Sequence, residues 1–142
     1  MNGEIILLTG KKNMEIFNGP EIIIQNHTDK ELFEKLSELN NLKNIMPEEI
    51  DHFEVNKDNC KIKMQNMPEL KLAISERIPY SKITLSTIES PLNFRLHCFI
   101  TPKENSCQAR LEVHAEINMM MRMMVQKPIN NLLNMLSQKM QH

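Results

Sequence analysis

The hydrophobic period of the chain changes at residue 51, and this change restricts the fold more than any other feature. From residue 29 up to this point, apolar residues recur at helical spacing, whereas after it they alternate with polar residues. The alternating stretches are residues 52–56, 61–65, 70–78, 81–88, 93–101 and 107–117, with clusters of Asn, Asp, Pro and Ser between them. Because the gaps are short, we expect neighbouring strands to pair antiparallel in a meander of hairpins.

Alternation gives the predicted sheet an apolar face and a polar face. The apolar phase contains Met64, Leu72, Ile74, Leu85, Phe94, Leu96, Cys98, Val113 and Ala115, and we expect Glu76 and Thr87 to continue it. The opposite phase is mostly charged and includes His97 and His114, which we expect to face solvent. A sheet of this kind needs helices over its apolar face.

Residues 119–140 supply that cover. Their apolar residues recur at spacings of four, four, three, four and four, in the order Met121, Val125, Ile129, Leu132, Leu136 and Met140. Such spacing predicts one helix with a long apolar stripe. At 1.5 Å per residue it would be about 33 Å long, enough to cross six or seven strands.

The residues before the sheet predict one further strand and two short helices. A β-branched strand over residues 21–26 follows a Gly19-Pro20 turn signal. Thr28 and Glu31 have the spacing of a capping box, which predicts a helix from Asp29. A second helical turn ends at Pro47. We expect residues 1–13 to be an N-terminal extension and residues 14–142 to form a single domain.

Composition excludes several classes of function. All three glycines precede residue 20, so the chain contains no Walker loop, dinucleotide-binding turn or nucleophile elbow. A net charge of -1 with one Tyr and no Trp argues against a nucleic-acid partner. Three cysteines without a CxxC pair indicate a reducing compartment, and we expect a cytoplasmic protein without stable membrane insertion. We expect no cofactor.

This order of elements resembles the helix-grip fold of the SRPBCC superfamily, which includes START-like lipid-transfer domains, polyketide cyclase-like proteins and coenzyme Q-binding proteins. The resemblance covers residues 14–141. Three short sequences are also similar to those of uncharacterised bacterial members. They are residues 42–47 (LKNIMP), residues 76–82 (ERIPYSK) and Lys127-Pro128 in the Met-rich helix. It implies an α+β fold in which a curved antiparallel sheet of six to seven strands wraps a long C-terminal helix, with two short helices after the first strand.

The resemblance also implies a hydrophobic cavity between the sheet and the long helix. We expect this cavity to bind or carry a hydrophobic small molecule, such as a lipid, an isoprenoid or a polyketide-like compound. The expected contacts are Met64, Leu72, Ile74, Glu76, Leu85, Thr87, Phe94, Leu96, Cys98, Val113, Ala115, Met121, Met124 and Val125.

Two other functions stay open. In a cyclase- or aromatase-like enzyme, Glu76, Thr87 or Cys98 would assist proton transfer in the same cavity. In an accessory protein, the sheet or the C-terminal helix would contact a protein partner or a second copy. Methionines at positions 119, 120, 121, 123 and 124 cover more than one helix face, so some must point to solvent, the cavity mouth or a partner.

Several of these residues also have an ordinary structural interpretation. Glu76 would then reach water or pair with Arg77 or Lys82, and several of the methionines would simply pack the core. His97 faces either His114 or Glu112, depending on where the preceding hairpin turns. We expect no metal site, because no HxxxH, HExxH or CxxC spacing is present.

Overall fold

The protein is described here by a computed structural model covering residues 11–48, 50–64, 67–90 and 92–141. The elements in chain order are β1 (Asn13–Ile24), α2 (Asp29–Leu36), the 3-10 helix η1 (Leu39–Asn44), β2 (His52–Val55), β3 (Cys60–Lys63), β4 (Leu70–Ile78), β5 (Lys82–Thr87), β6 (Asn93–Lys103), β7 (Ser106–Ile117) and α3 (Met119–Met140).

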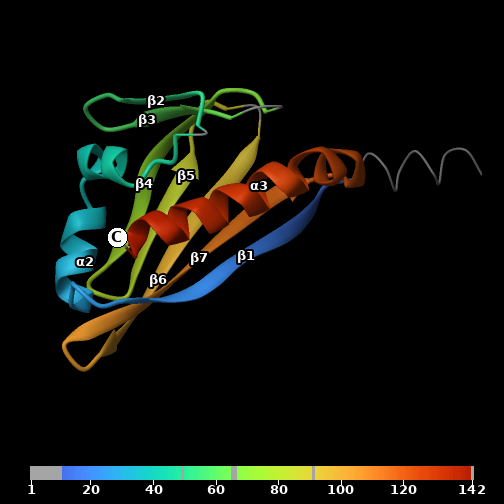
Figure 1. The fold of residues 1–142 in the computed structure, drawn as a ribbon. Coiled ribbons are helices and arrows are strands. Elements are labelled where there is room, and N and C mark those ends of the chain that lie inside the picture. Colours follow the sequence, from blue (N-terminus) through green and yellow to red (C-terminus); the bar gives the residue numbers. More distant parts are fainter. Residues whose placement is uncertain (1–10, 49, 65–66, 91, 142) are drawn as a thin grey trace, which may run out of the picture.

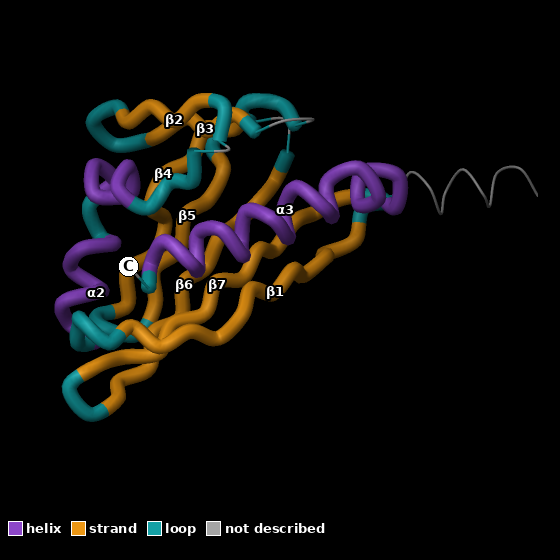
Figure 2. Tube along the Cα trace, viewed as in Figure 1, coloured by secondary structure: helices purple, strands orange, loops and turns teal. Residues whose placement is uncertain are grey.

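The strands form one antiparallel sheet of seven strands in the order β1-β7-β6-β5-β4-β3-β2. The sheet curves around α3, while α2 and η1 lie beside the end of α3 near the C-terminus (Figure 1). All the helices of the described chain lie on the same side of the sheet (Figure 2). This architecture confirms the predicted helix-grip fold.

Local signals placed the helices correctly. The Thr28 hydroxyl accepts from the Glu31 amide at 3.2 Å, and the Thr28 amide donates to the Glu31 carboxylate at 3.0 Å, so the capping box is present and α2 begins at Asp29. The long helix has the predicted bounds, Met119–Met140. It buries Ile129 and Leu133 almost completely, because its apolar stripe faces the sheet.

The first strand is longer than predicted. It begins at Asn13, which pairs with Ile117, and passes through Gly19-Pro20 with a register shift between Asn18 and Glu21. The turn expected at Gly19 is therefore wrong, and the dipeptide forms a bulge. A Cβ on Gly19 would lie 3.2 Å from the Leu111 carbonyl oxygen and 3.4 Å from Leu133 Cβ, so glycine permits the close approach of β1 to β7 and α3. Residues 1–10 of the expected extension lie outside the described residues.

The outer face of the sheet is less uniformly solvated than the sequence predicted. Thr84 and His97 point to this face, yet only 3% and 6% of their surfaces are exposed. The hairpin turns at Glu104-Asn105, so His97 faces Glu112 on β7. The rings of Phe99 and His114 flank the imidazole of His97 at 5.8 and 4.5 Å, and they exclude water from it.

Candidate functional site

An apolar cavity with two adjoining lobes lies between α3, η1 and the concave face of the sheet. Each lobe has a volume of about 50 Å³. The residues that line both lobes are Leu42, Met46, Leu85, Leu96 and Leu136. The first lobe reaches toward β2 and β3, and the second reaches toward α2 and the C-terminal end of α3.

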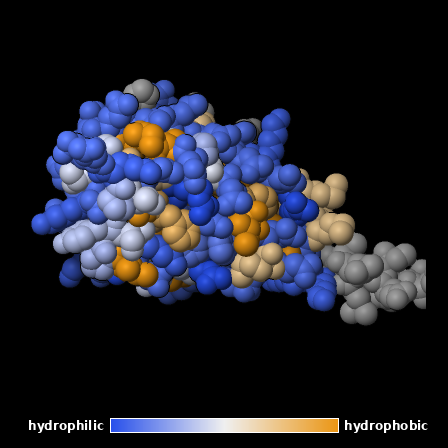
Figure 3. Space-filling view, turned by 90° about the horizontal axis from the view of Figure 1, so that it is seen from below, coloured by the Kyte–Doolittle hydropathy of each residue, from blue (hydrophilic) through white to orange (hydrophobic). Residues whose placement is uncertain are grey.

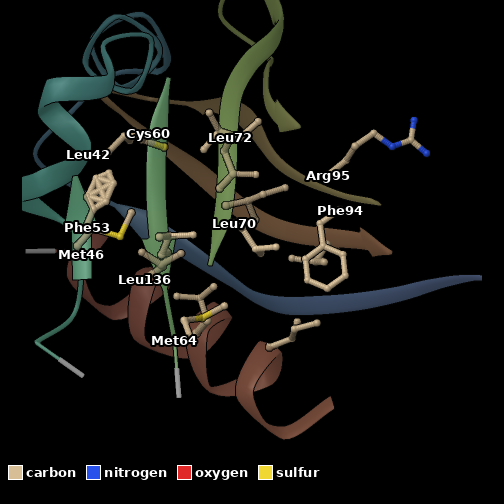
Figure 4. Close-up of a pocket in the computed structure, with 16 residues that line it drawn as sticks. Leu42, Met46, Phe53, Cys60, Met64, Leu70, Leu72, Phe94, Arg95 and Leu136 are labelled. Atoms are coloured by element: carbon tan, nitrogen blue, oxygen red, sulfur yellow. The ribbon is translucent and has the colours of Figure 1, made fainter. Parts of the chain in front are cut away.

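The cavity wall is made of hydrocarbon and sulfur. In Figure 4, Met64 and Leu70 from the sheet side and Leu136 from α3 point toward the same space. Arg95 also borders the first lobe, but its side chain points away from the cavity into solvent (Figure 4). No described charged side chain therefore enters the cavity.

The structure brings together many of the residues that the sequence proposed as ligand contacts. Those that line a lobe are Met64, Leu72, Leu85, Phe94, Leu96, Cys98 and Val113. Ala115 and Val125 are buried in the core outside the lining, and Met121 packs partly buried against that core. Met124 is 60% exposed, so it lies on the surface.

The prediction missed the lining residues that come from η1 and the loop after it, from β2 and β3, from the first residue of β4 and from α3. The main ones are Leu42, Met46, Phe53, Cys60, Ile62, Leu70, Ile129, Leu132 and Leu136. The apolar stripe of α3 already contained three of them, so its spacing was a usable signal. The contribution of η1 depends on how the chain folds back over the sheet, which no local pattern shows.

Glu76 faces away from the cavity, so its predicted place in the apolar register is wrong. A bulge at Ser75 shifts the register of β4: Ile74 pairs with Leu85, but Glu76 pairs with Thr84. The carboxylate of Glu76 lies on the outer face, 2.8 Å from the ammonium of Lys82. The hydrogen bond and charge of Lys82 lower the pKa of Glu76, as expected for a surface ion pair.

Thr87 and Cys98 are also unsuited to proton transfer. The Thr87 hydroxyl accepts a hydrogen bond from the Phe94 amide at 3.0 Å and donates one to the Phe94 carbonyl at 3.3 Å. Its proton is therefore already bound to the backbone of β6. Burial raises the pKa of the Cys98 thiol to about 12 and that of Cys60, on the first lobe, to about 11. Both thiols stay protonated and unreactive at neutral pH.

Within the described residues, no three His, Cys, Asp or Glu side chains are placed to hold a metal ion together. The Nδ1 atom of His97 lies 2.8 Å from the hydroxyl of Thr84 on the adjacent strand, β5.

Among the helices of the described chain, none combines the length and apolar character that crossing a membrane requires.

Solved structures share this fold across nearly the whole chain. A truncated norcoclaurine synthase from Thalictrum flavum superposes with a TM-score of 0.72 at 10% identity, covering 92% of this chain and 93% of its own. A protein from Thermus thermophilus gives 0.68 at 13% identity, covering 89% and 94%. A conserved protein from Geobacillus kaustophilus gives 0.61 at 18%, covering 89% and 93%. No family model and no curated protein matches the sequence.

Proposed function

We propose that the protein binds and carries a hydrophobic small molecule, such as a lipid, an isoprenoid or a polyketide-like compound, in the two-lobed cavity. The observation that carries this proposal is the continuous apolar wall shared by both lobes. It is formed by Leu85 and Leu96 on the sheet, Leu42 on η1, Met46 just after η1, and Leu136 on α3. Norcoclaurine synthase, which shares the fold, has been solved in complex with dopamine and hydroxybenzaldehyde. Ligand sites are generally concave and mostly apolar.

Loading requires the cavity to expand. Each lobe holds about 50 Å³, whereas pockets for drug-sized ligands measure about 300–1,000 Å³. Met46 and Met64 border the first lobe, and their unbranched side chains have several accessible rotamers. We propose that these methionines move aside as the ligand enters, so that the ligand takes the place of side-chain contacts.

The chemistry of the wall favours binding over catalysis. A cyclase-like enzyme would need a group in the cavity that exchanges protons near neutral pH. Glu76 points to the outer face, the Thr87 hydroxyl is bound to the backbone of β6, and the pKa of Cys98 is raised to about 12. The ligand is therefore held by shape and burial, and we expect it to leave chemically unchanged.

A second candidate function, contact with a protein partner or a second copy, is favoured by the start of α3. Four methionines there are each at least 59% exposed, so they do not pack the core: Met119, Met120, Met123 and Met124. Apolar patches lie among hydrophilic surface in Figure 3, including one beside the grey atoms.

All three cysteines are free and buried, which fits the reducing cytoplasm that we propose as the location.

The test is binding of Nile red, a neutral apolar dye, with displacement by extracts and by defined lipids. Leu85→Phe fills both lobes from the sheet and Leu136→Phe fills them from α3, and both should abolish the dye signal while circular dichroism stays native. Ile23→Phe is the matched control, since Ile23 is 43% exposed on the outer face of β1. Native mass spectrometry then identifies any co-purifying ligand. A wild-type protein that binds no dye or lipid would overturn the proposal.

A further inference from the structure

A polar cleft of about 300 Å³ lies near the apolar cavity, where the end of α2 and η1 come close to the turn between β2 and β3 and to β4. Its lining differs in kind from the cavity wall, because it contains the charged residues Glu38, Lys57, Asp58 and Arg77. Its apolar members are Leu39 and Ile74. The cleft is larger than either lobe of the cavity and open to solvent.

The bulge at Ser75 is what places Arg77 in this cleft. Arg77 pairs with Ile83, whose side chain is buried on the concave face, so Arg77 faces that side of the sheet too. One Nη atom of Arg77 donates to the Ser37 carbonyl at 2.9 Å, at the end of α2, and this bond fixes the guanidinium over the cleft. In the described ranges, no carboxylate lies within ion-pair distance of Arg77.

Leu39 and Ile74 form the apolar part of the cleft lining. Both line the cleft, and both pack partly buried against the hydrophobic core. Their neighbours belong to the cavity: Leu42 lies one helical turn after Leu39, and Leu72 precedes Ile74 on the same face of β4. These two side chains therefore lie where the lining of the cleft meets the core that surrounds the apolar lobes.

We propose that the ligand is a carboxylate amphiphile, whose head binds Arg77 in the cleft and whose hydrocarbon part passes between Leu39 and Ile74 into the cavity. This rests on the proposed function and specifies its ligand. A guanidinium with unused donors matches a carboxylate in a bidentate geometry. Arg77 is the charged group of the cleft that stands on the sheet, next to the apolar entrance. All four charged residues of the cleft are exposed to solvent, and Arg77 differs from the other three because it faces the concave side of the sheet and its guanidinium is held by the Ser37 carbonyl.

The test compares dansylaminoundecanoic acid with its methyl ester, which keeps the chain and removes the charge. By fluorescence titration at neutral pH, wild type should bind the acid about tenfold more tightly than the ester, in line with a charge-assisted hydrogen bond at a partly solvated site. Arg77→Gln should weaken acid binding to the level of the ester and leave ester binding unchanged. Lys103→Gln removes the same charge at the β6–β7 hairpin, outside the cleft, and should behave as wild type.

The outcomes separate this inference from the function on which it rests. Equal binding of acid and ester to wild type, with both lost in Leu85→Phe, would leave the carrier function standing and overturn the carboxylate preference. An acid preference that survives Arg77→Gln would also overturn it. Failure of both probes to bind wild type would count against the proposed function itself. Arg77→Lys should keep a reduced preference, because lysine keeps the charge and loses the planar fork.

Discussion

The buried imidazole of His97 should make the protein sensitive to mild acid. Charging this ring is unfavourable because burial removes it from water, and because His114, Lys82 and Arg95 add positive charge nearby. Glu112 opposes the shift from β7, and Glu76 lies beyond Thr84 on β4. The net effect lowers the pKa of His97 from 6.5 to about 4.

The sign and size of the effect follow from this pKa. Below pH 6.5 the unfolded chain binds a proton at His97 that the folded protein does not bind, so the free energy of unfolding falls as the pH falls. The stability that the neutral His97 ring contributes is complete above about pH 6.5 and is lost as the pH falls toward about 4. A shift of this size corresponds to about 3 kcal/mol in total. Between pH 7 and pH 4.5, the loss from this residue should be about 2 kcal/mol.

Urea unfolding of wild type and His97→Gln at both pH values measures this contribution. Glutamine stays neutral and can still bond to the Thr84 hydroxyl, so the variant should lose about 2 kcal/mol less than wild type over the same pH range. His52→Gln serves as the control for the substitution itself, because His52 is exposed on β2, outside the buried cluster around His97. An equal loss of unfolding free energy with falling pH in wild type and His97→Gln would refute the argument, because the ring would then take up a proton as easily in the folded protein as in the unfolded chain.

Three further results are expected. Thr28→Ala removes the hydroxyl of the capping box and should cost about 1 kcal/mol in urea unfolding. Leu133→Ala should cost about 3 kcal/mol because Leu133 is 0% exposed, whereas Met123→Ala, at 78% exposure, should change stability by less than about 0.5 kcal/mol. At pH 8, iodoacetamide should leave Cys98 and Cys60 unmodified until denaturant is added, because burial raises both pKa values to about 12 and about 11; labelling of native protein would contradict this.

Patterns among residues close together in the sequence were sufficient to predict most of the fold. The capping box at Thr28 fixed the start of α2, and the apolar stripe fixed both ends of α3. Alternation placed β4 at its observed bounds, Leu70–Ile78, and the other predicted strands of the meander close to theirs. These features are local, because each depends on residues only two to four positions apart.

Features that depend on distant contacts were not predictable in the same way. β1 continues through Gly19-Pro20 because β7 and α3 pack closely against that point, whereas the dipeptide alone indicates a turn. His97 is buried because Phe99 and His114 on the outer face close around it. Strand alternation states which face a residue occupies, but it does not state how well neighbouring side chains cover that face.

The bulge at Ser75 shows why one backbone irregularity changes the chemistry expected of the site. Alternation assumes a constant phase, and one extra residue inverts every later side chain of the strand. With a regular strand, the entrance to the cavity would present the carboxylate of Glu76 and would favour a cation or a hydrogen-bond donor. With the bulge, Glu76 pairs with Lys82 on the outer face, and Arg77 takes its place on the concave face. The polar run Ser75-Glu76-Arg77 contains no apolar residue to mark the phase, so the sequence could not reveal that the entrance carries a positive charge.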